Sequence, residues 1–163
     1  MDEQPLNSSI RSKAAKCHLA GLVWLPISVA LLLLTPKANQ DLGLFSIIFF
    51  AYPLFGMALG SLLTISIWKA IRGIHPFLDR SGRSAVNFIL SYSLYLLLMS
   101  TFLGITCEVT TASSPLEPLI GGLCGLFGIL LIGHLCATID RAMAAWNGRV
   151  HNHPLLIKFI ADI

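Results

Sequence analysis

The sequence predicts an all-α protein, an integral membrane four-helix bundle with both ends on the cytoplasmic side. Three observations lead to this prediction. Hydrophobic residues make up 55% of the 163 residues and charged residues only 12%, whereas soluble domains carry about a quarter charged residues. The apolar residues gather in four long runs, and the basic residues gather in alternate segments between them. The whole chain, residues 1–163, is therefore predicted to be a single transmembrane domain.

Four apolar runs define the predicted spans, over residues 17–34, 42–68, 85–105 and 119–139. A helix that rises 1.5 Å per residue needs about 20 residues to cross about 30 Å of hydrocarbon, and each run is close to that length or longer. Pro26 lies inside the first run, so we expect a kink or a gap in the hydrogen-bond ladder there. A neighbouring helix must cover such a gap in lipid, which favours one bundle of all four spans.

A cleaved signal peptide is the alternative interpretation of the first run. The stretch from Leu34 to Gln40 lacks a clear small-x-small cleavage site, and the run is longer than a usual signal core. We therefore expect the first run to stay in the membrane as a span.

The basic residues predict the orientation. Ten of the eleven Lys and Arg residues lie in the N-terminal segment, in residues 69–84 and in residues 140–163, while the first loop has only Lys37 and the third has none. The positive-inside rule assigns the basic side to the cytoplasm, and an even number of spans brings these three segments together there. We expect residues 69–84 and 140–163 to be inner-surface segments, with one short interfacial segment between the second and third spans and another at the C-terminus.

Glycines four residues apart predict close helix packing in two spans. Gly56 and Gly60 form a GxxxG pattern in the second span, and Gly121 and Gly125 form another in the fourth. Such pairs remove side-chain bulk from one stripe and let two helices approach closely. Packing within the chain is the favoured interpretation, and dimerisation through a stripe is the alternative.

A polar stripe marks the third span. Asn87, Ser91 and Tyr95 are spaced by four and share one helix face, and His134 lies inside the fourth span. Polar groups in hydrocarbon are costly unless they are bonded, so the stripe should face the bundle interior or water. Bonding between helices is the favoured role. A water-filled pathway lined by these residues, with gating near His134, is the alternative.

No residue set predicts catalysis or metal binding. His18, His75, His151 and His153 share the predicted inner side, but their number and spacing are not those of a closed metal site. The sequence has no HExxH, GxSxG or phosphate-binding glycine loop. We therefore predict no enzyme activity, no metal and no cofactor. The four cysteines form no CxxC pair, and Cys107, near the outer surface, is expected to be a free thiol.

The segment before the third span carries a resemblance to a known family. It contains Pro76, Phe77, Asp79, Gly82, Ala85, Asn87 and Phe88 in order. Cys17-His18-Leu19 opens the first span, and Trp146-Asn147-Gly148 precedes a second apolar stretch that begins at Pro154. Over about residues 15–160 the chain resembles small bacterial membrane proteins of a domain of unknown function. This family is distantly similar to the twenty-kilodalton, Tic-type subunit of the chloroplast inner-envelope protein translocon.

The resemblance implies a non-enzymatic bundle subunit or scaffold of a membrane assembly, in protein translocation or membrane biogenesis. The expected partners are the lipid bilayer and other membrane proteins or further copies of the chain, and nucleic acid is not expected. The residues expected to dock a partner, together with segment 146–160, are Pro76, Phe77, Asp79, Gly82, Asn87 and Phe88. A small channel or permease lined by the polar stripe is the alternative function. The sequence leaves open whether the membrane is a bacterial, including cyanobacterial, plasma membrane or a thylakoid.

Overall fold

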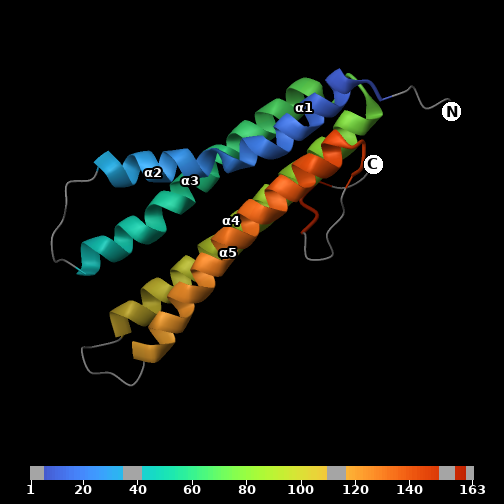
Figure 1. The fold of residues 1–163 in the computed structure, drawn as a ribbon. Coiled ribbons are helices and arrows are strands. Elements are labelled where there is room, and N and C mark those ends of the chain that lie inside the picture. Colours follow the sequence, from blue (N-terminus) through green and yellow to red (C-terminus); the bar gives the residue numbers. More distant parts are fainter. Residues whose placement is uncertain (1–5, 35–41, 110–116, 151–156, 161–163) are drawn as a thin grey trace.

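The computed structural model describes residues 6–34, 42–109, 117–150 and 157–160. All regular secondary structure in these ranges is helical (Figure 1). The elements are α1 (Ser8–Leu19), the 3-10 helix η1 (Ala20–Val23), α2 (Trp24–Leu34), α3 (Leu42–Ile71), α4 (Pro76–Val109) and α5 (Glu117–Trp146). Four stretches are long and apolar enough to cross a membrane: Ser8–Leu31, Ala51–Ile71, Pro76–Thr106 and Leu119–Trp146. The prediction of an all-α, multi-pass membrane protein with four spanning helices is confirmed.

The first span is longer than predicted and is broken where Pro26 requires it. The helix begins at Ser8 instead of residue 17, because the Asn7 side chain caps it by accepting from the Ile10 N–H at 2.9 Å. Pro26 has no N–H to donate to Leu22, and its ring crowds that carbonyl. The chain accordingly forms the 3-10 helix η1 over residues 20–23, and α2 leaves the direction of α1 at this point (Figure 1).

Helix α3 covers this break through its two small residues. A Cβ atom added at Gly56 would lie 2.8 Å from Cα of Trp24, and one added at Gly60 would lie 3.2 Å from the carbonyl oxygen of Gly21. The first GxxxG pair therefore packs against backbone within the chain. The second pair behaves differently, because a Cβ atom at Gly121 or Gly125 would meet nothing within 4 Å. That pair makes no close helix contact within the part of the chain that the structure describes.

The connection between the second and third spans is shorter than the predicted segment 69–84. Helix α3 continues to Ile71 and α4 begins at Pro76, so only residues 72–75 separate them. Proline suits the first helical position, and the His75 ring nitrogen Nδ1 accepts from the Phe77 N–H at 3.0 Å. The residues expected to form an interfacial segment are instead the first turns of α4.

Helix α5 also extends beyond its predicted end, from residue 139 to Trp146. Gly148, with φ of 76°, ends it. The Gly148 N–H donates to the Ala145 carbonyl at 3.1 Å, and the Arg149 N–H donates to the Ala144 carbonyl at 2.9 Å. This paired pattern is a Schellman motif, which a left-handed glycine permits at little cost.

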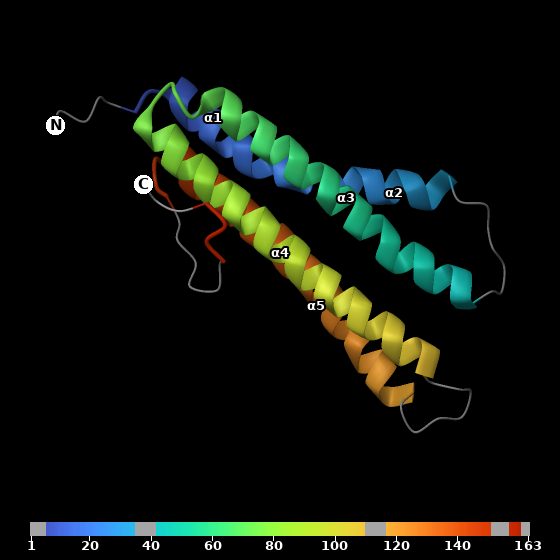
Figure 2. The ribbon, with the colours of Figure 1, turned by 180° about the vertical axis from the view of Figure 1, so that it is seen from behind.

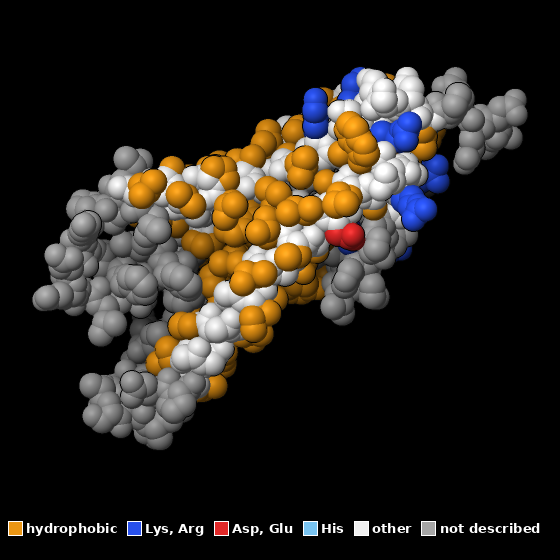
Figure 3. All heavy atoms as spheres, viewed as in Figure 1, with side chains coloured by type: hydrophobic (Ala, Val, Ile, Leu, Met, Phe, Trp, Pro, Cys, Tyr) orange, Lys and Arg blue, Asp and Glu red, His pale blue; other side chains and the backbone are white. Residues whose placement is uncertain are grey.

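The four spans pack most closely at one end. The start of α1, the turn at residues 72–75 and the end of α5 lie together there, and we call it the inner end (Figures 1 and 2). Lys and Arg side chains gather at this end, and hydrophobic side chains cover most of the rest of the visible surface (Figure 3). Away from the inner end, α4 and α5 run side by side, whereas α2 and α3 separate from each other toward their outer ends (Figure 2). This arrangement matches the predicted orientation, with the basic ends of the spans on one side.

Two apolar clusters fill the bundle. The inner apolar cluster joins α1, α3, α4 and α5 and consists of Ala14, Cys17, Trp68, Ile71, Phe77, Leu78, Ala85, Val86 and Ala145. The middle apolar cluster lies farther along the spans and consists of Trp24, Met57, Ile89, Leu96 and Phe127. Because lipid is as apolar as these side chains, tight packing between helices contributes more to stability here than removal from water does.

We predict that Gly56→Ala destabilises the bundle. The new methyl group would collide with the Trp24 backbone, which cannot move as a flexible side chain can, and overpacking of this kind costs about 1–3 kcal/mol. The free energy of unfolding, measured in mild detergent, should fall. Gly121→Ala is the matched control, since its methyl group meets no described atom, and it should leave stability unchanged or slightly raised. Equal losses from both changes would contradict the assignment.

Candidate functional site at the inner end

The residues predicted to dock a partner lie at the inner end, but most point into the bundle. Phe77 and Phe88 are only 5% and 4% exposed, and Phe77 belongs to the inner apolar cluster. Pro76 is exposed. An aromatic side chain buried within its own chain cannot anchor a partner, so the expected docking role of Phe77 and Phe88 does not fit their positions. The docking prediction for this end as a whole stays a prediction.

Gly82 permits the close contact between α3 and α4. A Cβ atom added there would lie 2.3 Å from Cδ1 of Trp68. No rotamer change at position 82 could relieve that collision, because the added atom is fixed by the backbone. The close contact with the indole of Trp68 therefore accounts for glycine at position 82.

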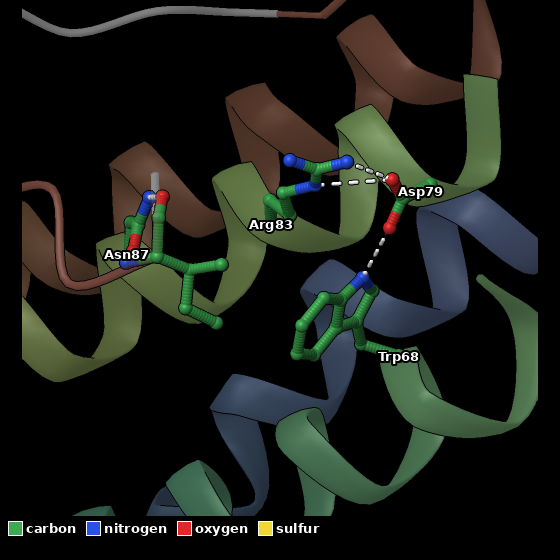
Figure 4. A network of polar contacts seen from close by, with 5 residues as sticks. Trp68, Asp79, Arg83 and Asn87 are labelled. Atoms are coloured by element: carbon green, nitrogen blue, oxygen red, sulfur yellow. Dashed lines mark hydrogen bonds and ion pairs between the residues drawn. The ribbon is translucent and has the colours of Figure 1, made fainter. Parts of the chain in front are cut away.

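Asp79 accepts from two donors, one on α3 and one on its own helix α4 (Figure 4). Its Oδ1 accepts from the Trp68 indole N–H at 3.0 Å, and its Oδ2 accepts from Nε of Arg83 at 3.0 Å. Arg83 and Asp79 also form an ion pair four residues apart on α4. Hydrogen bonds to a charged partner are stronger than neutral ones, at about 1.5–3 kcal/mol. Asp79 therefore fixes the angle between the two helices instead of projecting toward a partner.

Asn87 and Ser91, the first two members of the polar stripe, bind the backbone near the C-terminus. The Asn87 Oδ1 accepts from the Ile160 N–H at 2.9 Å, and its Nδ2 donates to the Ile160 carbonyl at 3.1 Å. The Ser91 hydroxyl accepts from the Ile157 N–H at 3.0 Å. The Ser91 hydroxyl can donate to either of two carbonyl oxygens, that of Asn87 at 2.7 Å and that of Ile157 at 3.4 Å. The Asn87 oxygen is the nearer acceptor. The two side chains thus hold residues 157–160 against α4.

The other two stripe residues belong to an aromatic group. His134 is fully buried and stacks on Phe88, with ring centroids 5.2 Å apart and an interplanar angle of 11°. Tyr92 lies 5.0 Å from the His134 ring and meets Tyr95 edge-on at 6.3 Å. His134 is thus packed among rings of α4, while Asn87 and Ser91 contact the C-terminal residues.

The sequence analysis did not predict the contacts of two polar residues at the inner end, Arg141 and His18. Arg141 is 2% exposed, and its Nη1 donates to the Ser84 hydroxyl at 3.1 Å while its guanidinium lies 4.3 Å from the centre of the Phe88 ring. His18 is also buried, with Nε2 at 3.3 Å from the Ser81 hydroxyl. The sequence analysis used Arg141 only as one of the basic residues that predict the orientation of the chain in the membrane. The signal available was the pair of serines one turn apart on α4, which supplies hydroxyl groups to two neighbouring helices.

The histidines with a conceivable metal role are not assembled in the described part of the chain. His18 is bonded to Ser81, and His75 caps α4, while His151 and His153 lie outside the described residues, as does the side chain of Cys107. Among the residues that the structure describes, no group of three His, Cys, Asp or Glu side chains is placed to hold a metal ion. The predictions concerning metal and cofactor stay predictions.

Comparison with known proteins assigns the chain to a family. The model of the magnetosome magnetite crystal formation protein family (MamF/MmsF) matches residues 9–160. The chain belongs to this family. The match supports the predicted small membrane-protein family and does not show the similarity to the translocon subunit. No curated protein and no solved structure matches the chain. Both Asp79 and the Asn87–Ser91 pair lie inside the range that the magnetosome family model covers.

We predict that the bond between Trp68 and Asp79 stabilises this family member measurably. Trp68→Phe removes the indole N–H, and Asp79→Asn removes the charge that strengthens the bond. In a double-mutant cycle, unfolding free energies in mild detergent should give a coupling energy of about 1–2 kcal/mol. Trp146→Phe, at an exposed tryptophan, is the control and should show no coupling to Asp79→Asn. A coupling energy near zero for the Trp68 pair would show that the bond is not maintained in the membrane protein.

Proposed function

We propose that this protein is a non-enzymatic scaffold subunit in the membrane that surrounds a growing magnetite crystal. The observation that carries the proposal is the match of the magnetosome magnetite crystal formation family over residues 9–160, which is nearly the whole chain. The structure supports a membrane location, because four of its helices are long and apolar enough to cross a bilayer. The family match favours crystal formation over protein translocation as the process that the subunit serves.

The distribution of bonds along the bundle suits a scaffold. The hydrogen bonds of Asp79, Ser81, Ser84 and Asn87 to other elements all lie at the inner end. Beyond it, α4 and α5 present exposed apolar side chains, namely Leu97, Leu98, Phe102, Ile105, Leu126, Ile129 and Ile132. This surface contacts lipid or the helices of other membrane proteins. In such a subunit, hydrogen bonds hold the helices together at the cytoplasmic side. The apolar surface of the outer half can bind other membrane proteins.

The proposed orientation places the ends of the spans opposite the inner end on the side of the membrane where the crystal grows. With the basic inner end in the cytoplasm, the segments between α2 and α3 and between α4 and α5 face the compartment that holds the crystal. The sequence between α2 and α3 includes Asp41, and the sequence between α4 and α5 includes polar residues such as Thr110 and Ser113. In this proposal the subunit places these two segments at the membrane surface next to the mineral, and other membrane proteins assemble around the bundle.

A channel along the polar stripe remains the second candidate, but the contacts favour the scaffold. Asn87 and Ser91 are engaged with residues 157 and 160, and His134 is packed among aromatic rings. A pathway through the bundle would need these groups to face water. Solute flux in reconstituted vesicles that is changed by Asn87→Leu would favour the channel over the scaffold.

Deletion and complementation in a magnetite-forming cell test the scaffold proposal. The tagged protein should fractionate with the crystal-bearing membranes, and its deletion should shift the crystal size distribution seen by electron microscopy. The wild-type gene and Gly121→Ala should restore the distribution, whereas Gly56→Ala should restore it less well because the bundle is weakened.

Two results would contradict the proposal. One is a tagged protein found only in membranes that carry no crystal, and the other is a deletion with normal crystals. Full activity of a Gly56→Ala protein present at normal levels would instead separate the function from the packing of the inner half.

A further inference from the structure

Residues 157–160 form a non-helical segment that lies against α4, and we call it the C-terminal strap. Its contact with α4 is made by side chains of α4 on one side and by the backbone of the strap on the other. Asn87 bonds both polar backbone groups of Ile160, and Ser91 accepts from the Ile157 N–H. Because these bonds are made to the backbone of the strap, they fix its position without using its side chains.

The strap lies at the depth of the inner membrane boundary. Asn87 is about 16 Å along α4 from Pro76 at a rise of about 1.5 Å per residue. Asn87 follows Arg80 and Arg83, two of the basic residues at the inner end. A position one turn beyond that charge, on a helix that then continues as an apolar span, corresponds to the border between lipid headgroups and acyl chains.

A non-helical backbone can lie at this depth only if its polar groups are bonded within the protein. The strap meets this condition at several groups. The N–H and C=O groups of Ile160 are bonded to Asn87, the Ile157 N–H is bonded to Ser91, and the Ile157 carbonyl accepts from the Phe159 N–H at 3.1 Å. Asn87 and Ser91 thus remove most of the cost of placing this segment beside lipid.

The side chains of the strap are arranged as in an interfacial anchor. Ile160 packs onto the inner apolar cluster. Ile157 and Phe159 face outward, 40% and 47% exposed, and Lys158 between them is exposed as well. Two apolar side chains beside a lysine suit an inner leaflet, where the rings and aliphatic chains enter the acyl region and the ammonium group reaches phosphate.

We propose that the C-terminal strap is a lipid-binding site whose occupant is a phospholipid of the inner leaflet. One acyl chain lies against Ile157 and Phe159, and the headgroup phosphate lies near Lys158. Asn87 and Ser91 act as positioning residues that hold the strap at the required depth. This proposal is independent of the scaffold function and would stand if the subunit proved to be a channel.

Photo-crosslinking in nanodiscs tests the proposal on the full chain. A photoreactive benzoylphenylalanine replaces Phe159, the protein is reconstituted in phosphatidylcholine with phosphatidylglycerol, and adducts are identified by mass spectrometry. We expect mainly phospholipid adducts, with a yield several-fold lower in Asn87→Leu combined with Ser91→Ala. Ser66→Ala, which removes an exposed hydroxyl bonded within its own helix, is the matched control and should not change the yield.

Other adducts would overturn the proposal. Adducts confined to a second copy of the chain would identify the strap as a contact between subunits, and adducts confined to the same chain would identify it as an internal cover. An unchanged lipid yield in the Asn87 and Ser91 variant would show that these residues do not position the strap.

A second measurement does not depend on the folding of that variant. Ile157→Gln changes an exposed side chain and should lower the lipid yield at position 159 without loss of helix content by circular dichroism. Lys158→Gln should lower the share of phosphatidylglycerol retained in native mass spectrometry relative to Lys16→Gln, an exposed lysine of α1. Equal retention in the two lysine variants, together with an unchanged yield for Ile157→Gln, would refute the site.

Discussion

The packing of Trp68 between α3 and α4 is the contact on which the inner end of this protein depends. The indole occupies the space that a side chain at position 82 would need, and only glycine leaves that space open. Its ring joins the inner apolar cluster, and its N–H donates to Asp79. The guanidinium of Arg72 lies over the ring, 5.5 Å from its centre. One aromatic residue thus combines close packing, a charge-assisted hydrogen bond and a cation–π contact at the turn between two spans.

The first turns of α4 distribute polar bonds to every neighbouring element. Asp79 bonds α3, Ser81 contacts α1, and Ser84 accepts from α5. Asn87 and Ser91 then bond the C-terminal strap. Because these residues follow one another at intervals of two to four around the helix, their side chains leave α4 in different directions. A polar segment that enters the membrane can be tolerated when each of its groups finds a partner, and here each partner comes from a different part of the chain.

This arrangement suits a subunit of a mineral-forming membrane. Most of the polar bonds described above hold the inner end, and farther along the spans the helices combine apolar contacts with single hydrogen bonds, such as that from the Ser28 hydroxyl to the Tyr52 carbonyl. The chain belongs to the magnetosome magnetite crystal formation family. The membrane in which the two ends of the bundle differ is therefore expected to be that of the magnetosome.

The sequence by itself determined the number of spans and the break at Pro26, and its basic residues predict the orientation. These features follow from local rules, since lipid requires continuous helices and proline removes a backbone donor wherever it stands. Only the tertiary structure decided the roles of the polar and small residues. Gly56 and Gly121 look alike in sequence, but small residues permit a close approach without creating it, and only Gly56 faces another backbone. Asn87 bonds Ile160, which lies 73 residues away in the sequence. Helical periodicity predicts contacts only between residues a few positions apart, so it could not predict this one.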